Sequence, residues 1–355
     1  MANSTARYRV TIFSVIFIFV LGFFMYLSPS RKTLSHAAES QTVTAQPKPR
    51  KPNGVIFMLI SPSRITQATM ALLNVEDRFN RRLKYPYVLF SPSGEADVIT
   101  EELRAKVRWI TEGRATFAII PKEMWDVPEF LDKSRIDQSL RKIGFTLGFF
   151  WRHPALARYD WLWRLDTDIE FHCDVPYDPI EKLVENNALY GFVQISPDGT
   201  WVQPTLASNV SRFIADNERL VPADANLGFS WKGAAGIEKA RSGIATSDDW
   251  TLMCMYNNFE ISHRSVWESE TYTKFFEYLD KEGGLYYERW GDAPIHSYGL
   301  ALSLRKNQVY KLPNLGYQHQ KWPYECPELD RCACVKEDVS RDFNDHKDSW
   351  FNPEA

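Results

Sequence analysis

Short apolar runs alternate with helical runs from Gly54 onward, and this alternation constrains the fold more than any other feature. Helical periodicity fills two of the stretches between the apolar runs, residues 65–80 and 136–151. The strand-like runs are "GVIFMLI" (54–60), "YPYVLF" (85–90), "ATFAII" (115–120) and "YDWLWRLD" (159–166). Strands and helices that alternate in this way predict an α/β fold with a mostly parallel central sheet.

Several classes of function are disfavoured by what the sequence lacks. It contains neither a GxGxxG fingerprint nor a P-loop, which argues against a Rossmann dehydrogenase and a P-loop ATPase. The formal net charge is −3, so the chain offers no basic stripe for nucleic-acid phosphates. A polar small molecule fits this composition better, and no nucleic-acid partner is expected.

The N-terminus carries the main localisation signal. Residues 10–27 are uncharged and lie between Arg7 and Arg9 on one side and Arg31 and Lys32 on the other. A helix of this length would span about 27 Å, close to the thickness of a bilayer core. A cleaved signal peptide is the alternative, but its apolar core is usually only about 7 to 15 residues long. We therefore predict an uncleaved signal anchor with the bulk of the chain in the lumen.

This anchor divides the chain into five parts. Residues 1–9 form a cytosolic tail, residues 10–27 the membrane span, and residues 28–53, rich in Ser, Thr, Gln, Lys and Pro, an exposed stem. Residues 54–335 form the globular lumenal domain. Residues 336–355 are charged and are predicted to form a tail that is loose or lies on the surface.

The cysteines and one sequon are compatible with a secretory-pathway protein. In an oxidising lumen the five cysteines predict one or two disulfides with one thiol left over. A zinc site at "CAC" is the alternative, although no paired CxxC motif supports it. The sequon is Asn209-Val210-Ser211. The cysteines are Cys173, Cys254, Cys326, Cys332 and Cys334.

Two acids close the fourth strand-like run. Asp166 and Asp168 are two residues apart, so in an extended segment both carboxylates point to the same face. There they could hold a divalent cation that bridges a diphosphate, or they could simply end a solvated strand. His319, in "GYQHQKWPY", is an ordinary surface residue by itself but could complete a metal site with the acid pair.

Glu260 lies in an apolar run, "NNFEIS". It could face solvent from an edge strand, which is the usual position of such a residue. A buried carboxylate would instead be a candidate nucleophile or base. The pattern alone leaves both possibilities open.

The stretch "YYERWGDAPIHS" (286–297) combines aromatic, charged and structure-breaking residues. Asp292, just before Ala-Pro, could cap a helix, or it could accept hydrogen bonds from sugar hydroxyls on a cleft wall. Trp290 could stack on a sugar ring. His296 is expected to be a hydrogen-bonded core histidine rather than a ligand.

A series of motifs follows in order along residues 54–334: "VEDRFN", "GFFWRHPAL", "YDWLWRLDTDIEFHCDVPYDP", "LYGFV", "PTL", "NNFEI", "FFEYLDKEGGLYYERWGDAPIHS" and "LGYQH". In these motifs the chain resembles the fungal α-1,2-mannosyltransferases of glycosyltransferase family 15, which are type II Golgi membrane enzymes.

The resemblance implies a GT-A type fold and retaining transfer of mannose from GDP-mannose, with Mn²⁺, to mannosylated glycoprotein acceptors. It implies that Glu260 is the nucleophile and that Asp292 lies near the acceptor or the reaction centre. Asp166 and His319 would bind the metal ion. Asp168 and Arg164, in the same tract as Asp166, would contribute to binding of the cofactor and donor.

The chain departs from the family pattern in three places. Asp166-Thr167-Asp168 replaces the usual Glu-Pro-Asp, which shortens the reach of the first acid by one methylene. The usual Arg-Asn pair is replaced within "ISPSRIT", where Arg64 could substitute. Ser139, in "DQSLRKIGF", occupies the position of an active-site Tyr. This last departure keeps an alternative open, a catalytically weak homologue that binds nucleotide sugar or mannan beside an active transferase.

Overall fold

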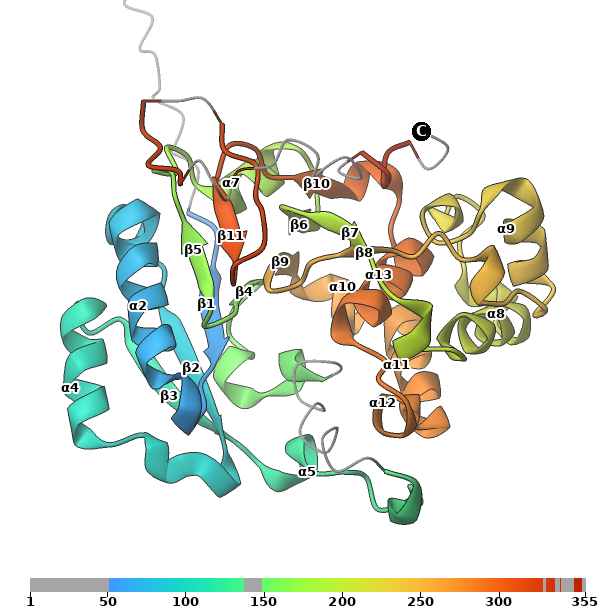
Figure 1. Ribbon diagram of the computed structural model, residues 1–355, viewed down its shortest axis with the longest axis horizontal. Helices are drawn as coiled ribbons and strands as arrows, with labels where there is room; N and C mark the ends of the chain where they lie inside the picture. Colours follow the sequence, from blue (N-terminus) through green and yellow to red (C-terminus); the bar gives the residue numbers. More distant parts are fainter. Residues whose placement is uncertain (1–50, 137–148, 328–329, 336–338, 340–347, 353–355) are drawn as a thin grey trace, which may run out of the picture. The chain divides into compact units, whose positions relative to one another are not determined.

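A seven-stranded sheet forms the centre of the structure (Figure 1), which is a computed structural model. The structure describes residues 51–136, 149–327, 330–335, 339 and 348–352. From Lys51 onward the chain forms one unit. The strand order is β10-β6-β9-β4-β1-β2-β3. These strands are β1 (Gly54–Leu59), β2 (Tyr87–Pro92), β3 (Ala115–Ile120), β4 (Trp161–Leu165), β6 (Tyr190–Phe192), β9 (Phe259–His263) and β10 (Val309–Lys311).

The prediction of a mostly parallel sheet is confirmed. β1 pairs in parallel with β2 and β4, β2 with β3, and β10 with β6. Within this described sheet only β9 runs antiparallel, because it pairs in that sense with both β4 and β6. The four strand-like runs of the sequence correspond to β1, β2, β3 and β4.

Around β1, β2 and β4 both faces of the sheet are buried, which explains why these strands are mostly apolar. In β1, Val55 and Phe57 point into one hydrophobic cluster, and Ile56 and Met58 point into another on the opposite face. This alternation follows from the two-residue period of a strand. Each face therefore needs its own layer of helices.

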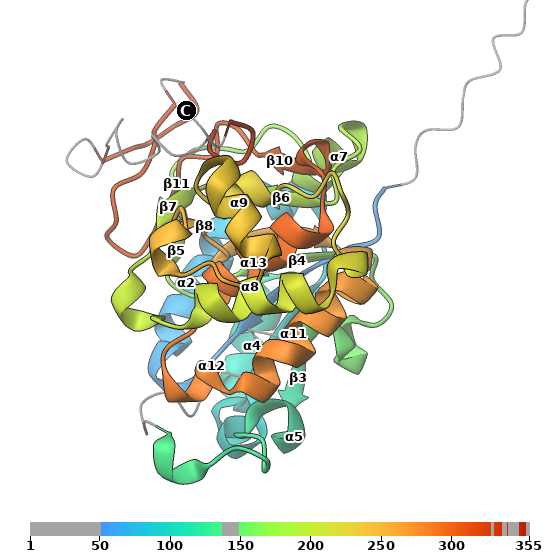
Figure 2. The same cartoon turned by 90° about the vertical axis from the view of Figure 1, so that its right-hand side faces the viewer.

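Helices cover each face, with α2 and α4 on one side and α8, α11 and α13 on the other (Figures 1 and 2). Thr100 caps α4 by accepting a hydrogen bond from the backbone N–H of Leu103. The described helices are α2 (Ile65–Val75), α3 (Arg81–Leu83), α4 (Glu101–Ile110), α5 (Lys122–Trp125), α7 (Pro179–Glu185), α8 (Leu206–Asp216), α9 (Gly233–Arg241), α10 (Arg264–Glu268), α11 (Glu270–Glu282), α12 (Gly284–Tyr287) and α13 (Asp292–Ser303).

The helix predicted over residues 65–80 continues past α2 as a π-helical turn, Glu76–Asn80. Glu76 is fully buried there and accepts a hydrogen bond from the Tyr87 hydroxyl at 2.6 Å. Arg114 donates a second bond to the same carboxylate at 2.5 Å. The motif "VEDRFN" therefore joins α2 to the sheet through a buried ion pair.

Two small antiparallel sheets extend the central one. β5 (Ile169–Phe171) pairs with β11 (Tyr317–His319), and β7 (Ile195–Pro197) pairs with β8 (Met253–Met255). The β5–β11 pair brings His319 opposite Ile169, directly after the predicted acid pair.

The cysteine prediction is confirmed. Cys173 is bonded to Cys332, and Cys326 is bonded to Cys334, while Cys254 is a buried free thiol. The first bond joins the segment after β5 to the C-terminal segment. The sequon, by contrast, is not an accessible acceptor, because Asn209 is 4% exposed and its side chain donates to the Thr205 carbonyl oxygen.

Some of the expected segments fall outside the described residues or differ from the prediction. The membrane span and Ser139 lie outside them, as does most of the predicted helix 136–151, whose end at Phe150–Arg152 is a 3-10 turn. In the part of the chain that the structure describes, no helix has the length and apolarity needed to cross a membrane. The tail prediction is wrong at its end, because Trp350 is fully buried against Phe229, with ring centroids 5.0 Å apart.

Candidate active site

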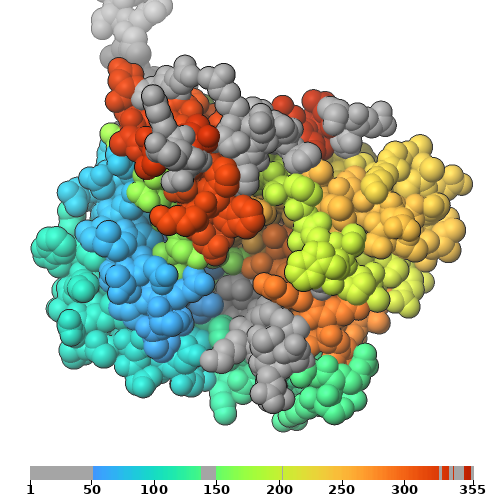
Figure 3. Space-filling view, in the orientation of Figure 1, coloured from blue at the N-terminus to red at the C-terminus, as the bar shows by residue number. Residues whose placement is uncertain are grey.

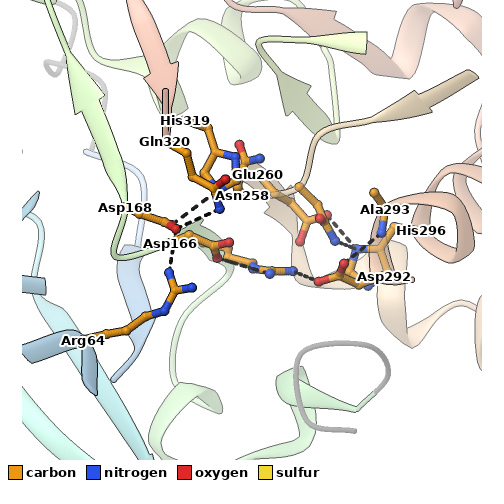
Figure 4. A network of polar contacts seen from close by, with 12 residues as sticks. Arg64, Asp166, Asp168, Asn258, Glu260, Asp292, Ala293, His296, His319 and Gln320 are labelled. Atoms are coloured by element: carbon orange, nitrogen blue, oxygen red, sulfur yellow. Dashed lines mark hydrogen bonds and ion pairs between the residues drawn. The ribbon is translucent and has the colours of Figure 1, made fainter. Parts of the chain in front are cut away.

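Five elements meet at the carboxyl end of β4 (Figure 4). β4 ends at Leu165, just before the acid pair, and its Arg164 lies opposite Glu260 of β9. β11 contributes His319, and α13 begins at Asp292. The turn that precedes α2 contributes Arg64. The site thus forms where ligands bind in open α/β sheets, as the sequence predicted.

The space-filling view shows a hollow bordered by blue, red and orange segments of the chain (Figure 3). A groove of about 800 Å³ opens beside Asp168 and is lined by Arg64, Gln67, Thr167 and Gln320, among others. Asp168 can therefore be reached from solvent through this groove.

Asp166, Asp168 and His319 form a possible cation site. Each offers a ligand atom, and these atoms all lie within 4.8 Å of one another. His319 Nε2 lies 3.3 Å from Asp168 Oδ1. Carboxylate oxygens with one imidazole nitrogen suit Mn²⁺ or a similar divalent cation. The residues present thus fit the metal ion that the sequence predicted.

Asp168 is held by positive and polar neighbours. Arg64 Nη1 lies 2.5 Å from Asp168 Oδ2, and Gln320 Nε2 donates to the same oxygen at 3.1 Å. Partial burial alone would raise the pKa of Asp168, but the hydrogen bonds from His319, Arg64 and Gln320 hold that pKa well below its usual range. The carboxylate is therefore ionised and ready to face a cation.

Arg164 bridges the acid pair and Asp292. Its Nε and Nη2 lie 3.3 and 3.2 Å from Asp166 Oδ1, and its Nη1 donates to Asp292 Oδ2 at 2.7 Å. Burial alone would lower the pKa of Arg164, but the carboxylates of Asp166, Asp292 and Glu260 raise it above its usual value. The guanidinium is thus a permanent positive charge at the centre of the site.

The pKa values of the two acids beside Arg164 are shifted in opposite directions. Although 34% of the Asp166 side chain reaches solvent, desolvation and the Asp292 charge raise its pKa, and Arg164 offsets this only in part. For Asp292, Arg164 and His296 outweigh the effect of burial and lower the pKa. Asp292 does not cap α13, since the N-cap is Gly291, and among the described backbone N–H groups of the helix the Asp292 carboxylate accepts from that of the next residue, Ala293.

Glu260 lies in a central strand, not at an edge, and is 1% exposed. The solvent-facing alternative is therefore wrong. The Tyr190 hydroxyl donates to Glu260 Oε2 at 3.0 Å, and His296 Nδ1 lies 2.8 Å from the same oxygen. Oε1 is buried and has no hydrogen-bond partner among the described residues. A buried carboxylate with one unengaged oxygen is unusual and marks a candidate reactive group.

The stretch 286–297 is mainly structural up to Gly291. Trp290 is 1% exposed and donates from Nε1 to Glu288, so the expectation that it stacks on a sugar ring is wrong. Glu288 also accepts from the backbone N–H and the hydroxyl of Thr205. These contacts set the position at which α13, with Asp292 and His296 in its first two turns, enters the site.

Sequence reasoning missed the contact of Glu260 with Tyr190 and His296. His296 was expected to be buried and hydrogen-bonded, which is confirmed, but its partner was not foreseen. The four-residue spacing from Asp292 to His296 was an available signal, because residues i and i+4 lie on one face of a helix. Tyr190, in "LYGFV", carried no comparable signal.

A cation-binding set beside a shielded carboxylate suits a reaction in which a phosphorylated group leaves a sugar carbon. The fold and the site therefore define a glycosyltransferase. The family model described as "Glycolipid 2-alpha-mannosyltransferase" matches residues 28–351. The chain belongs to this family, and the resemblance seen in the sequence is confirmed.

Known relatives support this assignment along most of the chain. The chain is 32% identical over 334 residues to the O-glycoside alpha-1,2-mannosyltransferase homolog 3 of Schizosaccharomyces pombe, covering 87% of this chain and 85% of the relative. Its fold is similar to that of the mannosyltransferase Ktr4p of S. cerevisiae in complex with GDP, with a TM-score of 0.73, 25% identity, and coverage of 86% and 82% of the two chains. It is also similar to core-mannan synthase A of Aspergillus fumigatus in a Mn/GDP form, with a TM-score of 0.70, 26% identity, and coverage of 82% and 80%.

Proposed function

We propose that the protein is a retaining α-1,2-mannosyltransferase that moves mannose from GDP-mannose to mannosyl acceptors on protein-linked glycans. Family membership supports the transfer of mannose. The observation that carries the mechanism is Glu260, which is buried in a central strand with Oε1 unengaged, on the strand next to the one that ends in the acid pair. The Mn/GDP and GDP forms of the two solved relatives support the choice of donor and cation.

Asp166 and His319 would hold the divalent cation. When bound, the ion supplies neutralisation of the negative charge that develops on the departing diphosphate. Asp168, fixed by Arg64 and Gln320, would add negative charge to the site and orient His319 through its 3.3 Å contact. Arg164 lies between Asp166 and Asp292, and its positive charge would stabilise both of them as carboxylates.

Glu260 would act at the anomeric carbon of the donor mannose. Its Oε1 could attack that carbon, or its charge could stabilise an oxocarbenium ion, by analogy with retaining glycosidases. Burial makes either electrostatic interaction stronger than it would be in water. Asp292, which lies across Arg164 from the acid pair, would accept a hydrogen bond from the acceptor hydroxyl.

We also propose that the chain is a single-pass type II protein of the Golgi membrane, anchored by residues 10–27. The two disulfides support an oxidising compartment for residues 51 onward. A cytosolic or nuclear protein would rarely keep them.

A binding homologue without activity is the less favoured alternative, since Ser139 replaces the family's Tyr. Against it, the residues implied for catalysis all lie in one site: Asp166, Glu260, Asp292 and His319. Hydrolysis of GDP-mannose in the absence of acceptor separates the two, because an inactive binder should release mannose no faster than the buffer does.

Transfer to methyl α-mannoside tests the proposal. The full chain in detergent is supplied with Mn²⁺ and either GDP-mannose or UDP-glucose, with and without a chelator. We expect a disaccharide only from GDP-mannose and only without the chelator. Product that is unaffected by the chelator, or equal use of both donors, would contradict the proposal. GDP binding without any product would favour the binding homologue.

A further inference from the structure

The two oxygens of the Glu260 carboxylate are treated differently by the protein. Both nearby donors, the Tyr190 hydroxyl at 3.0 Å and His296 Nδ1 at 2.8 Å, contact Oε2. Oε1 is equally buried but has no partner among the described residues. An unsatisfied buried acceptor is destabilising, so its presence requires an explanation.

His296 is held in a fixed orientation. It is fully buried on α13, and its ring packs against Trp267 and Phe150, with centroids 4.8 and 6.2 Å away. Because a carboxylate oxygen can only accept, the 2.8 Å contact requires a proton on Nδ1. The imidazole is therefore a donor whose direction is set by aromatic packing.

Tyr190 lies on β6, the strand that pairs with β9 on the side opposite β4. It is fully buried, and both burial and the Glu260 charge raise the pKa of its hydroxyl well above its usual value. The hydroxyl thus stays protonated and donates a hydrogen bond to Oε2. Two rigid elements, β6 and α13, converge on one oxygen.

Building on the function proposed above, we propose that His296 and Tyr190 are positioning residues that fix the Glu260 carboxylate so that Oε1 alone is presented to the donor sugar. The last side-chain bond of a free glutamate rotates easily, so the plane of its carboxylate is poorly defined. Two donors on one oxygen restrict this rotation, and the other oxygen then keeps one direction. Holding a reacting group in place in this way is worth a large factor in rate, because a displacement of about 1 Å can cost about a hundredfold.

The other charged or titratable groups around Glu260 do not take over this role. Arg164, its neighbour across β4, is engaged by Asp166 and Asp292. Tyr272, on α11, has a buried hydroxyl without a hydrogen-bond partner in the described part of the chain. The orientation therefore depends on Tyr190 and His296.

Three variants of the full chain in detergent test the inference: Tyr190→Phe, His296→Leu and His296→Asn. Asn carries an amide N–H at the same place along the side chain as His Nδ1, so it can still donate to Oε2. Tyr298→Phe is the matched control, since Tyr298 is as buried as Tyr190 but its hydroxyl makes no hydrogen bond to any described residue. Each variant is characterised by kcat and KM for GDP-mannose, by calorimetric affinity for GDP with Mn²⁺, and by thermal unfolding.

We expect kcat to fall about tenfold in Tyr190→Phe and about a hundredfold in His296→Leu, with His296→Asn recovering at least about tenfold of that loss. The affinity for GDP with Mn²⁺ should stay within about twofold of wild type in all of them. Tyr298→Phe should match wild type throughout.

Two results would overturn the inference. One is a kcat in Tyr190→Phe and His296→Leu equal to that of Tyr298→Phe. The other is a fall in GDP affinity and unfolding temperature that parallels kcat without rescue by His296→Asn, which would indicate a purely structural role. A wild-type protein that makes no product from GDP-mannose would contradict the proposed function itself, a result distinct from either of these.

Discussion

Arg64 and Asp168 form an ion pair at the edge of the proposed cation site. The Arg64 side chain is 46% exposed and that of Asp168 is 14% exposed, so solvent weakens the pair only in part. A cation that approaches Asp168 has to compete with this guanidinium. The pair therefore sets the affinity of the site for a metal ion when no nucleotide is bound.

Removing the Arg64 charge should strengthen binding of the free metal ion. We expect Arg64→Gln to raise the affinity for Mn²⁺ about two- to fivefold in the absence of nucleotide. The effect is small because one partly exposed ion pair contributes little free energy. Titration followed by electron paramagnetic resonance measures free Mn²⁺ directly. Arg305→Gln, which breaks an exposed pair with Asp224, is the control and should change nothing. Unchanged or weaker Mn²⁺ binding in Arg64→Gln would show that Asp168 does not face the ion.

At the residue scale, sequence reasoning brought together the acids and His319 but misjudged the residues that surround them. The acid pair, Glu260 and Asp292 lie in one site as the resemblance implied, and their roles stay predictions. Trp290 was wrongly assigned to a sugar, because nothing in the pattern separates a core indole from a cleft indole. The Oε2 contacts depend on how β6 and α13 pack, which is a tertiary property.

At the element scale, α12 and the turn after it position Asp292. Gly284 lies beneath the indole of Trp290, and a Cβ at this position would come within 2.1 Å of Trp290 Cε2. The indole cannot move away easily, since it is 1% exposed and hydrogen-bonded to Glu288. The glycine therefore allows the close packing on which the start of α13 depends.

Gly284→Ala should destabilise the protein by about 1 to 3 kcal/mol, as overpacking of a filled core usually does. Urea unfolding gives the free energy difference. Gly94→Ala is the matched control, because a Cβ there meets nothing within 4 Å, and it should change stability by less than about 0.5 kcal/mol. Equal stability of the two variants would show that Trp290 is not packed against α12 as described.

The two disulfides should contribute unequally to stability. Cys173 and Cys332 are 159 residues apart, whereas Cys326 and Cys334 are 8 apart. In the chain-entropy model the longer loop is worth about 5 kcal/mol and the shorter one about 2.6 kcal/mol. Replacing Cys173 and Cys332 by Ala should thus cost about twice as much unfolding free energy as replacing the other pair. A larger loss from the second pair would contradict this order.

Elements whose own residues follow one clear hydrophobic pattern were predictable. Elements whose structure depends on contacts with other elements were not. β1, β2, β3 and β4 are mostly apolar along their length and stood out in the sequence. β9 was ambiguous, because one acid within five residues gives no information about which strands flank it. The π-helical turn at Glu76 depends on Tyr87 and Arg114, which lie on other elements.

At the scale of the whole molecule, one half-buried acid should shape the dependence of stability on pH. Burial on α11 raises the pKa of Asp280 from 3.8 to about 6. Between these values the native state binds more protons than the unfolded state, so stability should fall as pH rises from about 4 to 6. At pH 7 the charged carboxylate is then a cost.

Asp280→Asn should remove this cost and raise the stability at pH 7 by about 1 to 2 kcal/mol, a value reduced for partial exposure. The gain should disappear near pH 4, where the wild-type carboxyl group is protonated. Urea unfolding of both proteins at pH 4 and pH 7 measures this difference. Asp126→Asn, at a residue whose side chain is 56% exposed, is the control. A gain of equal size at both pH values would contradict a raised pKa.

The overall organisation was predicted better than the details. Alternating periods indicated the α/β fold, and the acids after the fourth strand marked the end of the sheet at which the site lies. The burial of Trp350 was not predictable, because a short charged tail gives no sign of which hydrophobic cluster it will complete.

Proton NMR of mannosyl transfer from GDP-mannose to methyl α-mannoside, followed in time with Mn²⁺ present, shows directly whether transfer through Glu260 retains the α configuration. We expect the first disaccharide formed by the wild-type chain to be α-1,2-linked, and Glu260→Gln to form it at least about a hundredfold more slowly while still binding GDP. A β-linked first product, or transfer by Glu260→Gln at a rate near that of wild type, would contradict retaining transfer through Glu260.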